Sequence, residues 1–416
     1  MLSIYRIVIN LIILLSPFII FFRILKNKEH STRFKEKFCF FSQKKNKGKL
    51  IWFHGASVGE ILSVIPLIEK LEKNKKVKQI LVTSNTLSSS KILSDLKFKK
   101  TIHQFFPIDS NYLTKKFLDY WKPSVAIFID SEIWPNMLIN IKNKVIPLML
   151  INARITKKTF KKWRIFPLNA KKNFQKFDSC FASSLESKKY LELLGVKNIR
   201  FIGNLKFSQI EKDRNFLNIR LKKFFASKKI WCASSTHESE EKICITVHKK
   251  LKLKYKNLLT IIIPRHIDRT NSIIEEINNL NLKFHLHDSK KKIDGDTDIY
   301  LINSYGNTKS FFKVCKTVFL GGSIIKHGGQ NPLEAARYGC KILHGPNVWN
   351  FHEIYQLLNK FNVSTKIYNS NQLMLNIRRI INQKHNSIII KKKIKYLGNK
   401  ILYSTLKEIN FFIDKK

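Results

Sequence analysis

Two acidic residues follow apolar runs in this sequence, at positions where a carboxylate can act as a base. Glu60 lies in HGASVGE, where a strand-like run passes through a glycine turn into an amphipathic helix pattern. The field of a helix N-terminus keeps such a carboxylate ionised and available to accept a proton. The spacing Ser57-x-x-Glu60 equally fits a capping box, which is a structural role. Glu132 in FIDSEIWPN fits either a site residue or a solvated charge at a helix start.

A cluster of glycines marks a second candidate site. The chain has 14 glycines, and Gly321, Gly322, Gly328 and Gly329 fall within one short segment. Gly328 and Gly329 permit close approach of a backbone to a ligand. Asn331 and Pro332 then predict a helix N-cap and first helical residue, a terminus where an anion can bind.

Glu334, three residues after Asn331, has two interpretations. It fits a capping-box residue, and it also fits a carboxylate that accepts from ribose hydroxyls. Because the glycine cluster lies next to it, we favour the role of Glu334 in nucleotide binding.

The basic residues and the absence of several motifs narrow the possible ligands and enzyme classes. Arg265 ends the apolar run IIIPRH, where it suits phosphate or base recognition, although it also fits a surface cation. Lys206 lies in GNLKF, and its spacing alone does not distinguish it from other lysines. DGDTD at 294–298 mimics the DxD motif of metal-dependent sugar transferases, but its polar context predicts a solvated turn. The chain lacks HExxH, P-loop and GxSxG motifs, which excludes zincins, P-loop enzymes and α/β-hydrolases.

Apolar β-branched runs alternate with helical patterns and predict the elements that position these residues. This rhythm is typical of βαβ units and parallel sheets, and it occurs twice, which predicts two α/β domains with a boundary near residues 203–228. Ligands bind at the carboxyl ends of strands in such sheets. The predicted strands are 50–54, 79–83, 125–130 and 145–152, then 229–234, 258–264, 299–302, 318–322 and 341–346.

The N-terminus predicts an uncleaved membrane anchor. Residues 7–22 are apolar and are bounded by Arg6 and Arg23, close to the lower length limit for a spanning helix. No small-x-small cleavage site follows. Residues 23–49 carry ten Lys and Arg against two acids, a flank that stays in the cytoplasm. The segment also suits a helix lying in the membrane interface.

The composition limits the classes of protein to which the chain can belong. The 416 residues are 44% hydrophobic, which excludes intrinsic disorder as the main architecture. The net charge of +48 suggests nucleic acid, an anionic membrane or a phosphorylated substrate, or reflects lysine usage throughout the chain. The six cysteines are scattered without CxxC spacing, which indicates buried thiols and neither a zinc site nor a disulfide framework.

Seven segments together resemble the 3-deoxy-D-manno-octulosonic acid (Kdo) transferases of lipid A biosynthesis. In chain order they are HGASVGE, DSEIWPN, NARIT, GNLKF, SSTHESEE, PRHIDR and GGSIIKHGGQNPLEAA. The resemblance implies an α/β fold of GT-B type, with two Rossmann-like domains facing a cleft and an N-terminal membrane-anchor helix. The implied domains are an anchor at 1–25, an acceptor-binding domain at 26–207, and a CMP-Kdo-binding domain with terminal helices at 208–416.

The same resemblance implies a reaction and its residues. The reaction is a metal-independent, inverting transfer of Kdo from CMP-Kdo to the lipid A precursor, lipid IVA, on the cytoplasmic face of the bacterial inner membrane. It implies no cofactor and no nucleic-acid partner. Glu60 matches the catalytic base, and Glu132 and Lys206 match two transition-state-stabilising positions. The CMP-contacting positions are Pro264, Arg265, Tyr305, Gly306, Asn307, Asn331, Pro332, Leu333 and Glu334.

This chain departs from the family pattern in two places. At 305–307 the family more usually has Met-Gly-Glu, so only Gly306 agrees. Backbone contacts survive that change, whereas contacts from an acidic side chain do not. His327 and Gln330 stand where Arg and His are more usual.

Two alternatives remain at this point. One is a GT-B transferase that uses a UDP-sugar and a lipid acceptor. The other is a membrane-tethered basic protein that binds nucleic acid, although the sequence has no helix-turn-helix, zinc-finger or aromatic RNP pattern.

Overall fold

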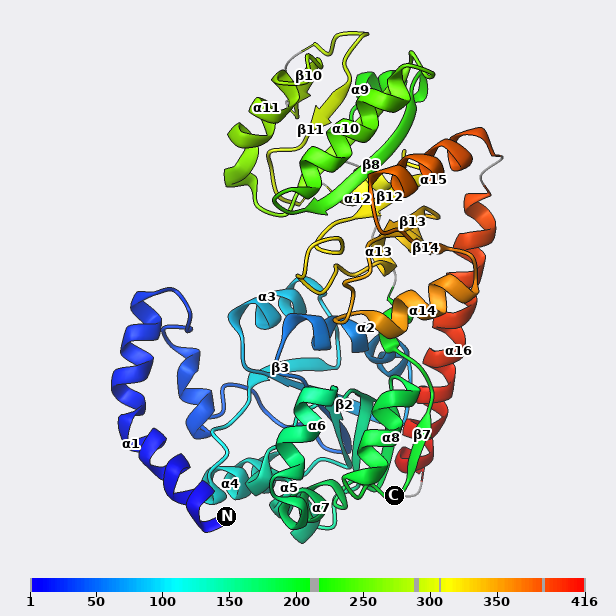
Figure 1. The fold of residues 1–416 in the computed structure, drawn as a ribbon. Helices are drawn as coiled ribbons and strands as arrows, with labels where there is room; N and C mark the ends of the chain where they lie inside the picture. Colours follow the sequence, from blue (N-terminus) through cyan, green and yellow to red (C-terminus); the bar gives the residue numbers. More distant parts are fainter. Residues whose placement is uncertain (1, 210–216, 288–291, 307, 384–385, 415–416) are drawn as a thin grey trace. The chain divides into compact units, whose positions relative to one another are not determined.

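The computed structural model of the chain describes residues 2–209, 217–287, 292–306, 308–383 and 386–414 (Figure 1). It forms two compact units. The first comprises Met1–Ile210 together with Leu397–Lys416, and the second comprises Glu211–Tyr396. The end of the chain therefore packs with the first unit, whereas the sequence analysis placed all of 208–416 in the second domain.

The first unit contains a parallel sheet in the order β3-β2-β1-β4-β5-β6-β7. Its central strands are buried on both faces, which explains why their sequences are continuous apolar runs. The predicted strands correspond to β1, β2, β4 and β5. The seven strands are β1 Lys49–His54, β2 Val77–Ser84, β3 Thr101–Phe105, β4 Val125–Ile129, β5 Leu148–Ala153, β6 Ser179–Ala182 and β7 Ile199–Phe201.

Helices connect these strands, and most begin at a hydroxyl or amide cap. Ser57, for example, accepts a hydrogen bond from the backbone N–H of Glu60 at the start of α2. The helices of this unit are α1 Leu2–Leu25, α2 Val58–Glu72, α3 Leu87–Asp95, α4 Asn111–Trp121, α5 Pro135–Asn143, α6 Lys157–Arg164, α7 Pro167–Phe174 and α8 Leu185–Leu193, with 3₁₀ turns η1 Arg33–Phe38 and η2 Leu205–Ser208.

Helix α1 contains the apolar run and is long and apolar enough to cross a membrane. Its residues Ile9, Ser16 and Ile20 are buried at helical spacing, so one face packs on the protein. Most of the remaining positions are exposed, including Leu14 at 72% and Phe18 at 68%.

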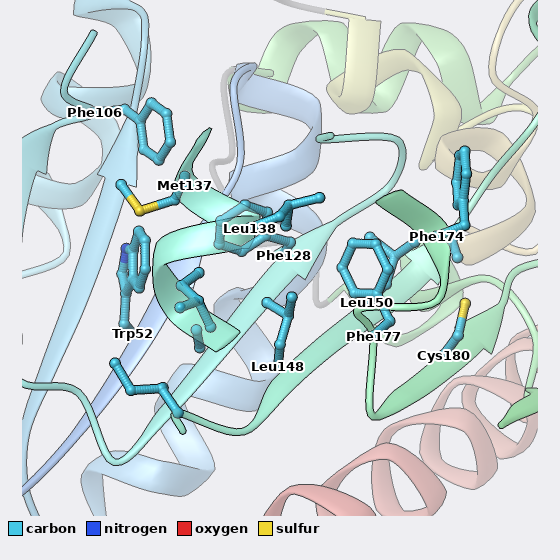
Figure 2. Close-up of a cluster of buried hydrophobic side chains, with 14 of the residues drawn as sticks. Trp52, Phe106, Phe128, Met137, Leu138, Leu148, Leu150, Phe174, Phe177 and Cys180 are labelled. Atoms are coloured by element: carbon cyan, nitrogen blue, oxygen red, sulfur yellow. The ribbon is translucent and has the colours of Figure 1, made fainter. Parts of the chain in front are cut away.

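A hydrophobic core fills the first unit between the sheet and the helices that cover it. Figure 2 shows Trp52 and Phe128 from neighbouring strands beside Met137 and Leu138 of α5. Cys180 belongs to the same cluster, and all six cysteines are buried free thiols, as the sequence predicts.

The second unit repeats the architecture with a parallel sheet in the order β10-β11-β9-β8-β12-β13-β14. The five strands predicted here are β8, β9, β11, β12 and β13. The strands are β8 Lys229–Thr236, β9 Leu258–Pro264, β10 Phe284–Leu286, β11 Ile299–Leu301, β12 Thr317–Leu320, β13 Lys341–His344 and β14 Ser364–Lys366. The helices are α9 Ile219–Ala226, α10 Glu240–Lys252, α11 Thr270–Asn278, α12 Thr308–Phe312, α13 Leu333–Arg337, α14 His352–Lys360, α15 Ser370–Asn382 and α16 Ser387–Asp414, with the 3₁₀ turn η3 Ile267–Arg269.

The last part of α16 is bound to the first unit by close packing and polar contacts. A Cβ at Gly398 would lie 2.4 Å from the carbonyl oxygen of Phe207, so only glycine allows this approach. Arg200 Nη1 lies 2.6 Å from Glu408 Oε1, and Lys76 Nζ lies 2.7 Å from Asp414 Oδ1. These contacts explain why the chain from Leu397 onward belongs to the first unit.

Candidate active site

Glu60 lies in the first turn of α2, and its side chain takes part in the N-terminal cap of that helix. The carboxylate accepts from the backbone N–H of Ala56 at 2.7 Å and from the hydroxyl of Ser57 at 2.7 Å. Gly55 makes the turn tight, because a Cβ there would lie 3.1 Å from Glu60 Cβ. Each carboxylate oxygen keeps a second lone pair beyond these bonds. The capping role and a role as base are therefore compatible.

The pKa of Glu60 is raised to about 7, whereas the sequence predicted a carboxylate that the helix N-terminus keeps ionised. Burial is the main cause, and the negative charges of Glu132 and Asp130 raise it further, whereas the hydrogen bonds from Ser57 and Ala56 oppose the shift. A carboxyl whose pKa lies near neutral pH combines a useful ionised fraction with strong basicity. The structure thus places the two predicted carboxylates, Glu60 and Glu132, within electrostatic reach of each other.

Glu132 follows β4 and is held by two aromatic residues. Trp134 Nε1 donates to Glu132 Oε2 at 2.8 Å. His54 Nε2 lies 3.3 Å from the same oxygen, and the imidazole is fully buried and stacked on Phe106. The other imidazole nitrogen, Nδ1, lies 3.0 Å from Thr83 Oγ1. The same nitrogen also lies 3.3 Å from the carbonyl oxygen of Thr83.

Asp130 and Asn152 bring Lys206 to the same edge of the sheet. Asp130 follows β4 and Asn152 lies near the end of β5, both with positive φ, at 57° and 52°. The amide of Asn152 donates to the Asp130 carboxylate, and its oxygen accepts from the backbone N–H of Leu205 at 2.9 Å. Burial raises the pKa of Asp130, and the charges of Lys206 and Arg154 oppose this shift. Lys206 therefore lies within electrostatic reach of the Asp130 carboxylate.

The first unit thus gathers three carboxylates and one lysine at the carboxyl ends of β1, β4 and β5. Sequence analysis proposed Glu60, Glu132 and Lys206 as site residues, but it assigned no role to His54, Asp130 or Asn152. The available signal for the last two was a polar residue at the end of an apolar run. This arrangement can take a proton from a hydroxyl group and stabilise charge that develops beside it.

In the second unit, the Glu240 carboxylate binds the backbone of the glycine loop that follows β12. The buried carboxylate of Glu240 accepts from the backbone N–H groups of Gly322 at 2.7 Å, Ser323 at 3.0 Å and Ile324 at 2.9 Å. It also accepts from His237 N at 3.1 Å. These amides are consequently occupied, and an anion at this loop must use other donors. Glu240 lies in SSTHESEE, for which the sequence indicated no role.

Imidazole and guanidinium groups supply such donors. The rings of His237 and His327 lie 4.2 Å apart, and that of His266 lies 5.8 Å from His237. Burial, followed by the charges of His327, His266, Arg265 and Arg269, lowers the pKa of His237 to about 4. Arg265 follows β9 with an exposed side chain, whereas Pro264 is buried at the strand end. This cluster suits an anionic ligand.

The predicted cap at Asn331 is present with a shifted helix boundary. Helix α13 begins at Leu333, and Pro332 precedes it as N-cap instead of the first helical residue. Asn331 Oδ1 nevertheless accepts from Leu333 N at 3.2 Å. The side chains of Pro332 and Leu333 are buried, whereas Asn331 and Glu334 are half-buried.

The remaining predicted contact segment is partly outside the described residues. Tyr305 is exposed, and Gly306 has a φ of +93° that favours glycine. Asn307 lies outside the described residues.

The DGDTD segment is only partly the solvated turn that its sequence predicts. Asp296 is exposed and pairs with Lys283. Asp298, in contrast, is buried and bound by His248, Lys252 and the backbone N–H of Lys283. These partners lower the pKa of Asp298 to about 2, against the effect of burial. Its carboxylate is therefore committed to structure.

Comparison with known proteins identifies the family. Residues 32–209 match the family model described as "3-Deoxy-D-manno-octulosonic-acid transferase (kdotransferase)". The 3-deoxy-D-manno-octulosonic acid transferase of Rickettsia bellii is 36% identical over 335 residues, which cover 79% of each chain. The enzyme of the same name from Haemophilus influenzae is 27% identical, over 74% of this chain and 73% of its own.

Solved structures show the fold. A UDP-N-acetylglucosamine 2-epimerase superposes with a TM-score of 0.61 at 12% identity, covering 89% of this chain and 97% of its own. A glycosyltransferase from Rickettsia africae superposes with a TM-score of 0.56 at 12% identity, covering 89% and 100%. With the two parallel sheets, this likeness confirms an α/β fold of GT-B type. The chain belongs to the 3-deoxy-D-manno-octulosonic acid transferase family and is a glycosyltransferase.

Proposed function

We propose that this enzyme transfers Kdo from CMP-Kdo to the lipid A precursor lipid IVA, with Glu60 as general base and without a metal ion. The observation that carries the mechanism is the Glu60 carboxylate, with its pKa raised to about 7 beside Glu132 and Asp130. The family membership supports Kdo as the transferred sugar.

The proposed step is a single displacement. The acceptor hydroxyl oxygen bonds to the anomeric carbon of Kdo, and the bond from that carbon to the phosphate oxygen breaks. The electron pair leaves with CMP, the hydroxyl proton passes to Glu60, and the anomeric configuration inverts. Lys206 and Glu132 act on charge that develops at the reacting atoms.

The leaving group is a phosphate monoester, which cations and N–H donors can stabilise without a metal. In the second unit, Arg265 and the imidazoles of His237, His266 and His327 are suited to that anion. Asn331 and Glu334 are proposed to contact the nucleotide, together with the backbone at Gly306. Pro264, Pro332 and Leu333 are buried, so we propose that they contribute to the nucleotide site through its shape.

The N-terminus supports a lipid acceptor at a membrane. Helix α1 exposes a largely apolar surface, and the basic residues of 23–49 follow it directly. Each Lys or Arg near an anionic leaflet contributes about 1 kcal/mol of binding. We place the enzyme at the cytoplasmic face of the bacterial inner membrane on these grounds.

Donor competition tests the proposal. Purified full-length protein is incubated with preformed CMP-Kdo, labelled in the sugar, and lipid IVA in detergent, with EDTA present. We expect label in the lipid, and we expect CMP to inhibit more strongly than UDP. Loss of transfer in EDTA with rescue by Mg²⁺ or Mn²⁺ would contradict the metal-free mechanism. Transfer from a UDP-sugar but not from CMP-Kdo would contradict the donor.

A further inference from the structure

Two polar residues near the start of α1 contact the part of the first unit that carries Glu132. Tyr5 OH donates to Asp109 Oδ2 at 2.8 Å, and Arg6 Nε donates to Asn136 Oδ1 at 2.9 Å. Both residues are half-buried in a largely apolar helix. Attachment to a membrane needs neither bond.

Asp109 is the cap of α5, supplied from another segment. Its carboxylate accepts from the backbone N–H of Asn136 at 3.0 Å and of Met137 at 2.8 Å, both in the first turn of α5. The Asn136 amide donates back to the carbonyl oxygen of Asp109 at 2.6 Å. Trp134, the N-cap residue of α5, makes no side-chain cap bond. The start of α5 therefore depends on Asp109.

The start of α5 in turn fixes Glu132. Only three residues separate Glu132 from Asn136, and Trp134 between them donates to the Glu132 carboxylate at 2.8 Å. Pro135 restricts the backbone at the first helical position. A displacement of Asn136 is thus carried through Trp134 to the carboxylate.

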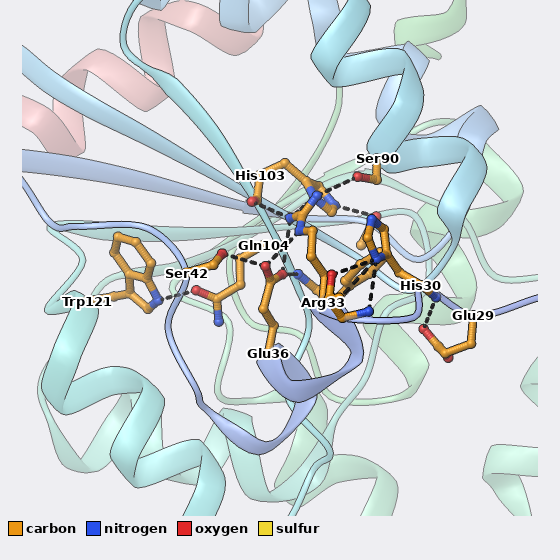
Figure 3. A network of polar contacts seen from close by, with 12 residues as sticks. Glu29, His30, Arg33, Glu36, Ser42, Ser90, His103, Gln104 and Trp121 are labelled. Carbon is orange, nitrogen blue, oxygen red and sulfur yellow. Dashed lines mark hydrogen bonds and ion pairs between the residues drawn. The ribbon is translucent and has the colours of Figure 1, made fainter. Parts of the chain in front are cut away.

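The other end of α1 is also tied to the first unit, so α1 is a docked element. Arg23 Nε lies 3.2 Å from the buried Glu29 carboxylate, which also pairs with Lys37. Figure 3 shows the adjoining network, in which Arg33 binds Glu36 at 2.7 Å. Glu36 also accepts from the backbone N–H of Phe105 in β3 at 2.8 Å.

We propose that Tyr5 and Arg6 are positioning residues for Glu132, which makes the N-terminal helix part of the catalytic apparatus as well as an attachment to lipid. The inference rests on the role of Glu132 in the proposed function. Asp109 and Asn136 transmit the effect by holding the first turn of α5.

Tyr5→Phe tests this in the full-length enzyme, because it removes one hydroxyl and keeps the apolar surface of α1. We expect kcat to fall about 3- to 10-fold, the loss associated with one buried hydrogen bond to a charged group and a displaced site residue. The KM for CMP-Kdo and vesicle retention should not change. Tyr112→Phe is the matched control, because Tyr112 lies in α4 of the same unit and is 71% exposed. Its kcat should equal that of wild type.

A double-mutant cycle separates positioning from general stability. In a Glu132→Gln background, adding Tyr5→Phe should lower kcat less than twofold, because the positioned carboxylate is already gone. Arg6→Lys, which loses the Nε donor but keeps the charge, should show the same pattern and serves if Tyr5→Phe fails to fold. Unchanged kcat in both variants, or full additivity with Glu132→Gln, would overturn the inference. Normal kcat in Glu132→Gln alone would instead refute the role of Glu132 in the proposed function, and the inference with it.

Discussion

Replacing Glu60 with glutamine separates its two roles, because the structure shows both in one carboxylate. The glutamine oxygen can accept from Ala56 N and its amide can donate to Ser57 Oγ, so the turn keeps its bonds. The amide cannot take the acceptor proton. We expect kcat to fall about 10²- to 10⁴-fold while CMP-Kdo binding is nearly unchanged.

The raised pKa also predicts the sign of the stability change. The shift from 4.5 to about 7 corresponds to an upper limit of about 3 kcal/mol, and partial solvation of Glu60 reduces this to about 1–2 kcal/mol. Because the folded-state pKa is raised, this stabilisation is fully present below pH 4.5 and is lost as pH rises through 7. Glu60→Gln, which stays neutral, should therefore be as stable as wild type at pH 4.5 and more stable at pH 8.

The assays are steady-state transfer to lipid IVA, calorimetric titration with CMP-Kdo, and thermal unfolding at both pH values. A low kcat with retained donor affinity and higher stability at pH 8 is the expected combination. Near-normal kcat would refute the base assignment and make Glu132 the next candidate. Equal stability of the variant and wild type at pH 8 would show that the Glu60 carboxylate is not destabilised by burial and by the neighbouring carboxylates.

Further predictions test neighbouring parts of the account. Wild-type kcat/KM should rise with pH through about 7, as Glu60 ionises, and this inflection should vanish in Glu60→Gln. Ser57→Ala should lower the free energy of unfolding by about 1 kcal/mol and spare most of the turnover, as measured by denaturation and transfer assays. Arg265→Ala should raise the KM for CMP-Kdo far more than that for lipid, and equal effects on both would contradict donor binding. Glu240→Gln should destabilise the protein by about 2–4 kcal/mol, because a neutral amide cannot accept all the loop N–H bonds of the carboxylate.

The strands that the sequence predicts are those with clear apolar runs, such as β4 and β9. Strand β3 escapes the pattern because His103 and Gln104 interrupt it, although each side chain has a hydrogen-bond partner within the protein. His103 Nε2 lies 2.9 Å from Ser84 Oγ, and Gln104 accepts from Trp121 Nε1 at 3.0 Å. Such partners come from other elements, so the local sequence does not reveal them.

The candidate site shows the same difference between features that the local sequence reveals and features that depend on distant residues. Glu60 and Glu132 could be proposed from the sequence because each follows an apolar run that forms a strand of a parallel sheet. The bond from Asn152 to Leu205 that brings Lys206 into place joins segments 53 residues apart, and spacing cannot show it. The return of α16 to the first unit likewise depends on packing of Gly398 against Phe207.

The mass of the lipid product tests the central claim most directly. Full-length protein, preformed CMP-Kdo and lipid IVA are incubated together, and the lipid is analysed by mass spectrometry alongside a reaction that contains Glu60→Gln. We predict a lipid heavier by one or more Kdo residues, with one CMP released for each, and almost none of it in the variant. Lipid of unchanged mass with the wild-type protein, or a gain only from a UDP-sugar, would contradict the account.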